Sequence, residues 1–387
     1  MSLFMNKNLQ MVFGVTLMAI IGLSLISPAL PKIQDAFQLT KTEVGLLVTA
    51  FTLPGVLVSP LVGFMSDKRG RKGIVILSLA VFSITGGSIA FIRDYNVVLI
   101  MRIFQGAAAS GLSTLSMALI GDLFEGDDRA VAMGYNASVL SIGAASFPVI
   151  GGALASIAWY FPFYIFFLAI PIALIILKYM GVPLKDKDEH HKSYLRMSIR
   201  ELSNMKIAVL TSSCIVTFIL LYGPFMTYFP LYLSDMFEAE SFTIGLLISG
   251  MSITTCVVAY FSGRIYERMG GNKPMVLGLL FYSLAMLFIY LMKDPLMGII
   301  AVCLYGLGQG MNIPILQTEF LNSVDHEARG IVSALYSTNV RLGQSIGPVL
   351  MGLFYMVGEY DMVFLLSALI SFSMGILMLI ARIRKII

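Results

Sequence analysis

The grouping of apolar residues constrains this chain more than any other feature. Twelve predominantly apolar segments follow one another along its 387 residues, and each is long enough to cross a bilayer as a helix of about 20 residues. Unpaired backbone groups are costly in lipid, so spanning segments form helices or closed barrels. We therefore predict an all-α membrane protein with twelve transmembrane helices. The segments are 9–31, 40–62, 74–92, 95–119, 130–157, 160–180, 207–232, 241–262, 274–292, 296–318, 331–357 and 361–381.

Composition argues against several other classes of protein. Hydrophobic residues make up 58% of the chain and charged residues 12%, against about 45–50% and 25% in soluble domains, so no large soluble domain fits beside the spans. The net charge of +4 is small and scattered, which argues against a nucleic-acid partner. No phosphate loop of the form G-x-x-x-x-G-K-(S/T) occurs, and the three histidines fall in predicted loops. We expect no metal, no cofactor and no enzymatic activity.

A polar stretch divides the spans into six plus six. It is the one place where the chain has the composition of a linker. We predict an N-terminal six-helix half at 1–180, a cytoplasmic linker at 181–206 and a C-terminal six-helix half at 207–387.

Basic residues predict the orientation in the membrane. One alternate set of loops, together with both termini, holds 20 of the 26 lysines and arginines. Loops rich in these residues stay on the cytoplasmic side. We therefore predict a multi-pass protein of the cell (inner) membrane with both termini in the cytoplasm.

The two halves repeat each other. A shift of 200 positions superposes Gly63 on Gly263 and Pro148 on Pro348, among other matches. Six spans is an even number, so both copies start on the same side of the membrane and the repeats are parallel. Transporters built from such halves bind their substrate near the midplane, between the halves.

The loop after the second span carries the most specific motif. Residues 63–72 have the sequence GFMSDKRGRK, in which the specified positions are Gly63, Asp67, Lys68, Gly70, Arg71 and Lys72. This segment resembles the signature loop of the major facilitator superfamily, G-x-x-x-D-(R/K)-x-G-(R/K)-(R/K), at every specified position. We expect Gly63 to let two helices approach closely. A plain positive-inside loop would explain the basic residues but not Asp67 and the two glycines.

Asp122 ends the fourth span on the same side of the membrane as this loop. We therefore predict a charge network among Asp67, Arg71 and Asp122. The resemblance implies a cytoplasmic latch, because in the superfamily this cluster holds the outward-open state.

The fourth span also contains an arginine. Arg102, Gln105 and Gly106 are similar to the R-x-x-x-G element of the same superfamily. An arginine within a span is costly, and by default it marks a functional site or a buried pair. The alternative is that Arg102 extends to the outer end of the span, roughly 10 Å away at 1.5 Å per residue.

Glycine–proline motifs occur in the fifth and eleventh spans. Each resembles, with one departure, the G-x-x-x-G-P-x-x-G-G element associated with exporters and antiporters of the superfamily: Phe147 replaces a glycine in the first motif and Met351 in the second. Glycines four residues apart permit tight helix contact, and proline bends a helix. The motif residues are Gly143, Pro148, Gly151, Gly152, Gly343, Gly347, Pro348 and Gly352.

The resemblance covers essentially the whole chain and is strongest to the twelve-span drug/proton antiporter branch. It implies the major facilitator fold and a monomeric secondary transporter of a bacterial or archaeal cell. Such a protein exports a small organic or amphipathic solute in exchange for protons, and its partners are the solute, protons and membrane lipid. An exporter of a specific metabolite, sugar, siderophore or lipid precursor stays open as an alternative. A non-transporting receptor or enzyme is poorly supported.

Polar and aromatic residues within the spans are candidates for the substrate cavity, although about half of such residues pack between helices or face lipid. Arg341 lies roughly 15 Å into the eleventh span. A charge at that depth faces water or a partner, so we predict that Arg341 lines the cavity and binds an anionic or polar group. A structural ion pair is the alternative. The candidates are Gln105, Tyr135, Asn136, Tyr222, Phe225, Tyr228, Gln309, Asn312, Tyr336, Asn339 and Arg341.

Proton coupling needs a carboxylate whose proton affinity changes as the cavity alternates. Many drug/proton antiporters place one in the first span, but the apolar part of this first span offers only Ser24 and Ser27. We predict that coupling runs through Asp35 or Glu319, with Arg102 tuning Asp35. A solvated acid at a helix end is the alternative for Glu319.

Overall fold

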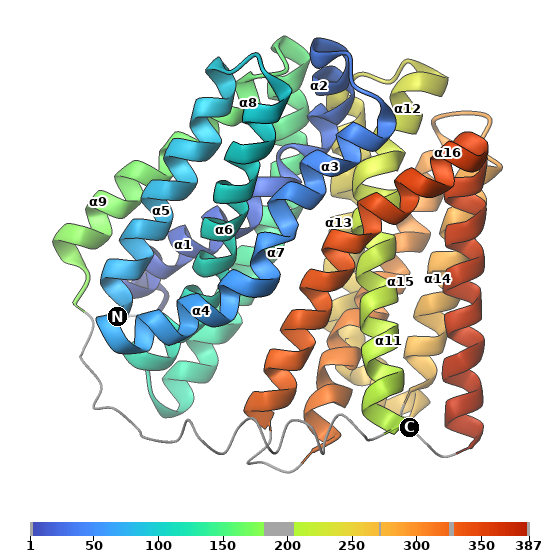
Figure 1. Ribbon diagram of the computed structural model, residues 1–387. Coiled ribbons are helices and arrows are strands. Elements are labelled where there is room, and N and C mark those ends of the chain that lie inside the picture. The colour runs from blue at the N-terminus through green and yellow to red at the C-terminus, as the bar shows by residue number, and fades with distance from the viewer. Residues whose placement is uncertain (1–2, 182–204, 271, 325–328, 385–387) are drawn as a thin grey trace. The chain divides into compact units, whose positions relative to one another are not determined.

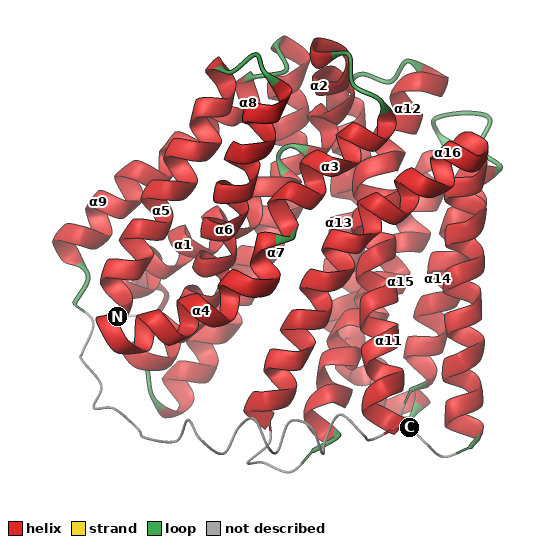
Figure 2. Ribbon diagram, viewed as in Figure 1, coloured by secondary structure: helices red, strands yellow, loops and turns green. Residues whose placement is uncertain are grey.

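The structure is a computed structural model that describes residues 3–181, 205–270, 272–324 and 329–384. Every regular element in these ranges is a helix, and none is a strand (Figure 2). The fold class predicted from the sequence, an all-α membrane protein, is confirmed. Most of the predicted linker lies outside the described residues.

Within the described residues, eleven helical stretches are long and apolar enough to cross a membrane. The last of them, Val332–Ile383, leaves helical geometry at Gly358 and Glu359. This kink divides the stretch into two arms, which correspond to the last two of the twelve predicted spans. The described residues therefore account for all twelve.

The first compact unit comprises residues 1–188 together with 240–249. Its spans are helices or pairs of shorter helices, joined by brief turns (Figure 1). The helices are α1 (Lys7–Ser24), α2 (Leu30–Phe37), α3 (Lys41–Thr52), α4 (Pro54–Arg69), α5 (Arg71–Ser88), α6 (Tyr95–Leu123), α7 (Gly126–Ile157), α8 (Phe161–Tyr164) and α9 (Ala169–Tyr179).

The second compact unit comprises residues 189–239 and 250–387. It contains a π-helix, η6, which continues directly from α11 into α12. Helix α13 begins in the segment that groups with the first unit and continues into the second. The elements are α11 (Met205–Leu220), η6 (Leu221–Tyr228), α12 (Phe229–Phe237), α13 (Ser241–Met269), α14 (Lys273–Tyr290), α15 (Met297–Asn322) and α16 (Arg329–Ile383).

Local sequence explains where several helices of the first unit begin. The Asn6 side chain accepts hydrogen bonds from two backbone N–H groups in the first turn of α1, which satisfies donors that have no helical partner. Thr40 and Glu43 form a reciprocal capping box at the start of α3. Gly70 has a φ of 87° between α4 and α5, a backbone conformation that favours glycine.

Helix α6 is the packing centre of the first unit, because it contacts α1, α3, α4, α5 and α7. Gly106 makes the approach to α3 possible. A Cβ atom at this position would overlap the backbone carbonyl oxygen of Phe51. Small residues at helix crossings allow such backbone contacts in membranes.

In the second unit, two close approaches join α11 to α16. In α16, a Cβ at Gly343 would lie 2.6 Å from the carbonyl oxygen of Ile215, and one at Gly347 would lie 2.8 Å from that of Ile219. The first arm of α16 therefore packs backbone to backbone against α11. Helix α14 packs against α15 and α16.

The close approach at Gly106 gives a stability prediction. Replacing Gly106 with Ala forces α6 away from α3, because the Phe51 carbonyl belongs to the backbone and cannot rotate aside. Overpacking of this kind costs about 1–3 kcal/mol, so the variant should unfold at a lower temperature in detergent. Gly134→Ala is the matched control, since nothing lies within 4 Å of a Cβ there. Equal melting temperatures for the two variants would contradict this account of the crossing.

Candidate functional site

The three residues of the predicted charge network lie together in the first unit. Arg71 begins α5, and its Nε lies 2.7 Å from Oδ2 of Asp122, near the end of α6. Its Nη2 lies 3.4 Å from Oδ1 of Asp67, near the end of α4. The Asp122 side chain is 10% exposed and that of Asp67 is 52% exposed. One guanidinium therefore joins the ends of three helices, and its shorter, better shielded contact is with Asp122.

The two glycines of the same loop differ in their roles. Gly70 occupies the turn between α4 and α5 with positive φ. Gly63 has room around it, because a Cβ there would first meet Thr114 at 4.0 Å, an ordinary van der Waals contact. The expectation that Gly63 permits a close helix approach is therefore wrong. In this unit that approach occurs at Gly106 instead.

Arg102 is enclosed within the first unit and is 1% exposed. Its Nη1 donates to the carbonyl of Gly22 at 3.0 Å and to Oε1 of Gln105 at 2.9 Å, and its Nε lies 3.4 Å from the carbonyl of Leu47. The guanidinium also lies 4.5 Å from the ring centre of Phe51. The side chain thus turns into the bundle rather than extending to its outer end. Among the described residues it forms no ion pair.

The glycine motif of α7 forms two close contacts inside the first unit. A Cβ at Gly151 would overlap the carbonyl oxygen of Leu25, and one at Gly152 would overlap that of Ser241, at the start of α13. Pro148 lies inside α7, and Pro348 lies inside α16. The close contacts of the α7 motif thus come from two adjacent glycines, whereas those of the α16 motif come from Gly343 and Gly347, which have the predicted spacing of four residues.

The candidate cavity residues fall into two groups. Six are buried, namely Gln105, Asn136, Phe225, Tyr228, Asn312 and Asn339. Five keep partial exposure, namely Tyr135, Tyr222, Gln309, Tyr336 and Arg341. The second group therefore has side-chain surface that no packed helix covers.

The three buried asparagines among these candidates form hydrogen bonds between helices. Each forms a hydrogen bond with a threonine of the first helix of its half. The pairs are Asn136 with Thr16 at 2.7 Å, Asn312 with Thr217 at 2.8 Å and Asn339 with Thr211 at 3.2 Å. Polar pairs of this kind stabilise helix contacts in membranes, so these asparagines have a structural use.

Glu319 lies in a three-residue cluster of the second unit. Its Oε2 is 3.1 Å from Nζ of Lys206, at the start of α11, and its Oε1 accepts a hydrogen bond of 2.7 Å from the Tyr266 hydroxyl, in α13. The Glu319 side chain is 6% exposed. The alternative of a solvated helix-end acid is therefore wrong. The other coupling candidate, Asp35, is exposed on α2.

Arg341 is the deepest charge in the described part of the second unit. Its Nη1 lies 3.5 Å from Oε1 of Gln344, one turn further along α16. Among the described residues no carboxylate pairs with it, so the alternative of a structural ion pair is not what the structure contains. Tyr222, in the π-helix, is near enough to interact with it electrostatically.

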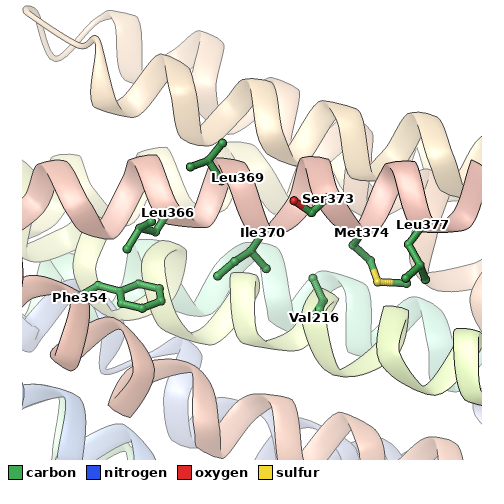
Figure 3. Close-up of a pocket in the computed structure, with 8 residues that line it drawn as sticks. All are labelled: Val216, Phe354, Leu366, Leu369, Ile370, Ser373, Met374 and Leu377. Carbon is green, nitrogen blue, oxygen red and sulfur yellow. The ribbon is translucent and has the colours of Figure 1, made fainter.

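A groove of about 460 Å³ lies between α11 and the two arms of α16. Figure 3 shows that Val216, Phe354 and a row of side chains from the second arm of α16 line it. Ser373 supplies the one polar side chain of the lining. None of the candidate cavity residues lies here, and the lining is apolar apart from Ser373.

Sequence analysis missed the two partners of Glu319. Lys206 marks the first turn of a span, where basic residues are common, and Tyr266 belongs to a stretch without a motif. Their pairing joins positions more than fifty residues apart, and no local spacing signals it. Among the described residues, no three histidine, cysteine or acidic side chains gather where they could hold a metal ion.

Known proteins similar to this chain are membrane transporters, in agreement with its membrane-spanning helices. A family model described as "Major Facilitator Superfamily" matches residues 12–348 and 237–385. A bacillibactin exporter of Bacillus subtilis (strain 168) is 25% identical over 94% of each chain. The quinolone resistance protein NorA of Staphylococcus aureus (strain COL) is 25% identical over 90% of each chain.

Solved structures show the same fold at lower identity. A variant of the nucleoside transporter NupG matches with a TM-score of 0.82 and 14% identity, over 97% of this chain and 99% of its own. A bacterial homolog of the human lysosomal transporter Spinster matches with a TM-score of 0.79 and 17% identity, over 97% and 94%.

An all-helical chain whose spans repeat at an interval of 200 residues, with a charge network behind its second span, has the architecture of a membrane transporter. The chain belongs to the Major Facilitator Superfamily. It is a multi-pass membrane transporter of a small-molecule substrate rather than an enzyme.

The charge network predicts a graded effect of two substitutions. Asp67→Asn should impair transport while leaving the protein folded and in the membrane, because it removes one charge from the Arg71 cluster. Asp122→Asn should impair it more, since that contact is shorter and less exposed. Transport rates in reconstituted vesicles, with Asp128→Asn as the exposed control, measure both effects. Transport at the wild-type rate in both Asp67→Asn and Asp122→Asn would contradict a role of this charge network in transport.

Proposed function

We propose that this protein exports an organic solute from the cell by proton antiport with alternating access. Similarity over nine-tenths or more of both chains to a bacillibactin exporter and a quinolone resistance protein carries this proposal. The glycine–proline motifs of α7 and α16 support it, since they resemble an element of exporters and antiporters. The moving bodies are the two halves, 1–180 and 207–387, with both termini on the cytoplasmic side.

The Arg71 cluster serves as the cytoplasmic latch in this proposal. It joins α4, α5 and α6 through charges that are only partly exposed. Partial burial strengthens such contacts relative to free surface pairs. In this role the cluster would help to hold the outward-open state.

Proton coupling is proposed to run through Glu319 or Asp35. Glu319 has the better-defined environment, because Lys206 and Tyr266 both contact its carboxylate. A proton on Glu319 removes its attraction to Lys206, so protonation would loosen the contact between α15 and α11. Asp35 is the exposed alternative, and Arg102 would tune it through space, since its contacts are with α1, α3 and Gln105.

The narrower alternative is an exporter of one metabolite, sugar, siderophore or lipid precursor. The bacillibactin exporter supports it, because its name specifies one compound and the match covers 94% of both chains. A panel of solutes tested under an imposed pH gradient separates a broad from a narrow exporter. Transport of a single chemical family would establish the alternative.

Two substitutions test the coupling assignment. Proton-driven uptake into inverted vesicles should fall to the level without a gradient in Glu319→Gln or in Asp35→Asn, because the essential proton site is lost. Glu267→Gln, which alters an exposed acid near the end of α13, should leave uptake unchanged. If both variants keep full gradient-dependent accumulation, coupling does not use either residue.

A further inference from the structure

The charges inside the described spans are unevenly distributed. Every described aspartate and glutamate of a span lies within three residues of its end or of the kink at Gly358 and Glu359. Two arginines, Arg102 and Arg341, lie deeper than any other described charge. Charges at such depth are costly unless water, a partner or a ligand compensates them. The described interior is therefore basic, and it has no deep carboxylate for an organic cation.

Arg102 is compensated by the protein itself. Its guanidinium bonds the carbonyl of Gly22, in the last turn of α1. The C-terminal end of a helix carries partial negative charge, so a cation there is stabilised. Together with the bonds to Leu47 and Gln105, this leaves Nη2 as the one guanidinium nitrogen of Arg102 without a described partner. The side chain is 1% exposed, so it is closed off from solvent.

Arg341 is not compensated in this way. A guanidinium has five N–H donors, and the described contact with Gln344 is long, at 3.5 Å. The side chain keeps partial exposure. Tyr222 lies near it on η6, a π-helical turn of the kind that often occurs at functional sites.

We propose that the transported solute is an organic anion and that Arg341 binds its anionic group. This inference rests on the proposed function of solute export, and it adds the charge class of the solute. A guanidinium binds carboxylate or phosphate groups through two parallel hydrogen bonds. Tyr222, which is near enough to interact with Arg341 electrostatically, adds an aromatic side chain for the apolar part of the solute. An organic cation finds repulsion from Arg341 and no deep carboxylate among the described residues.

The first test measures binding by thermal stabilisation of the purified protein in detergent. The anionic probes are salicylate, 1-hydroxy-2-naphthoate and carboxyfluorescein, and the cationic probes are tetraphenylphosphonium, ethidium and rhodamine 6G. Anions should stabilise the wild type. In Arg341→Gln the apparent affinity should fall roughly 10- to 100-fold, as expected for a lost charged hydrogen bond. Stabilisation by cations alone, or by no anion of the panel, overturns the proposal.

Two further variants separate binding from folding. Arg341→Lys keeps the charge but loses the planar fork, so it should keep part of the anion affinity even if Arg341→Gln folds poorly. Arg264→Gln removes an exposed positive charge of the same unit and should bind anions as the wild type does. If Arg264→Gln and Arg341→Gln lose the same amount of anion affinity, the loss follows from net charge. That result would overturn the proposed anion site at Arg341.

Transport in proteoliposomes separates this inference from the proposed function. Exchange of one exported monovalent anion for one imported proton moves charge in one direction, whereas exchange of a monovalent cation for a proton is electroneutral. An imposed membrane potential should therefore drive anion transport in the wild type. If anion transport does not depend on the pH gradient, proton antiport is contradicted, while the proposed anion site still stands. If the protein instead exports cations, and Arg341→Gln exports them as the wild type does, proton antiport stands and the proposed anion site is overturned.

Discussion

Hydrogen bonding of the backbone inside the bilayer is the constraint on which the rest of this structure depends. The first span of each half is interrupted, by a 3-10 turn at Ser27–Ala29 in one and by the π-helix η6 in the other. Near each interruption a side chain donates a hydrogen bond to a backbone carbonyl, a group that lipid cannot satisfy. Arg102 bonds the carbonyl of Gly22 in the first case, and the Thr227 hydroxyl donates to the carbonyl of Tyr222 at 2.6 Å in the second. The two repeats thus solve one problem with different residues.

Much of the fold could be predicted because it depends on local pattern. Span length and the polar stretch between the two halves are properties of short windows. The spacing of Asp67, Arg71 and Asp122 also placed three charges at one end of the spans. Gly63 marks the limit of this reasoning, since a glycine in a motif need not lie at a crossing. Where two helices cross depends on the facing helix, which the motif does not contain.

Polar residues within spans resist prediction for a related reason. An asparagine in lipid needs a partner, and a threonine on a neighbouring helix satisfies it as well as a substrate would. Asn136 and Asn339 were therefore reasonable cavity candidates until their bonds to Thr16 and Thr211 were located. The pair of Lys206 and Glu319 likewise joins two helix ends that are distant in sequence. From the sequence, such a residue is expected either to have a partner on another helix or to serve transport. The positions of the neighbouring side chains in the structure show which of the two applies.

The two arginines deep within the spans, Arg102 and Arg341, differ in their partners, and this difference matters for transport. Carbonyl groups of α1 and α3 accept hydrogen bonds from Arg102, which offsets part of the cost of its buried charge. Arg341 has no such compensation among the described residues, so an empty transporter that shields it from water carries the full cost of a buried charge. A bound anion removes that cost. Under the proposed binding mode, the loaded transporter therefore closes more readily than the empty one, which favours tight coupling between occupancy and conformational change.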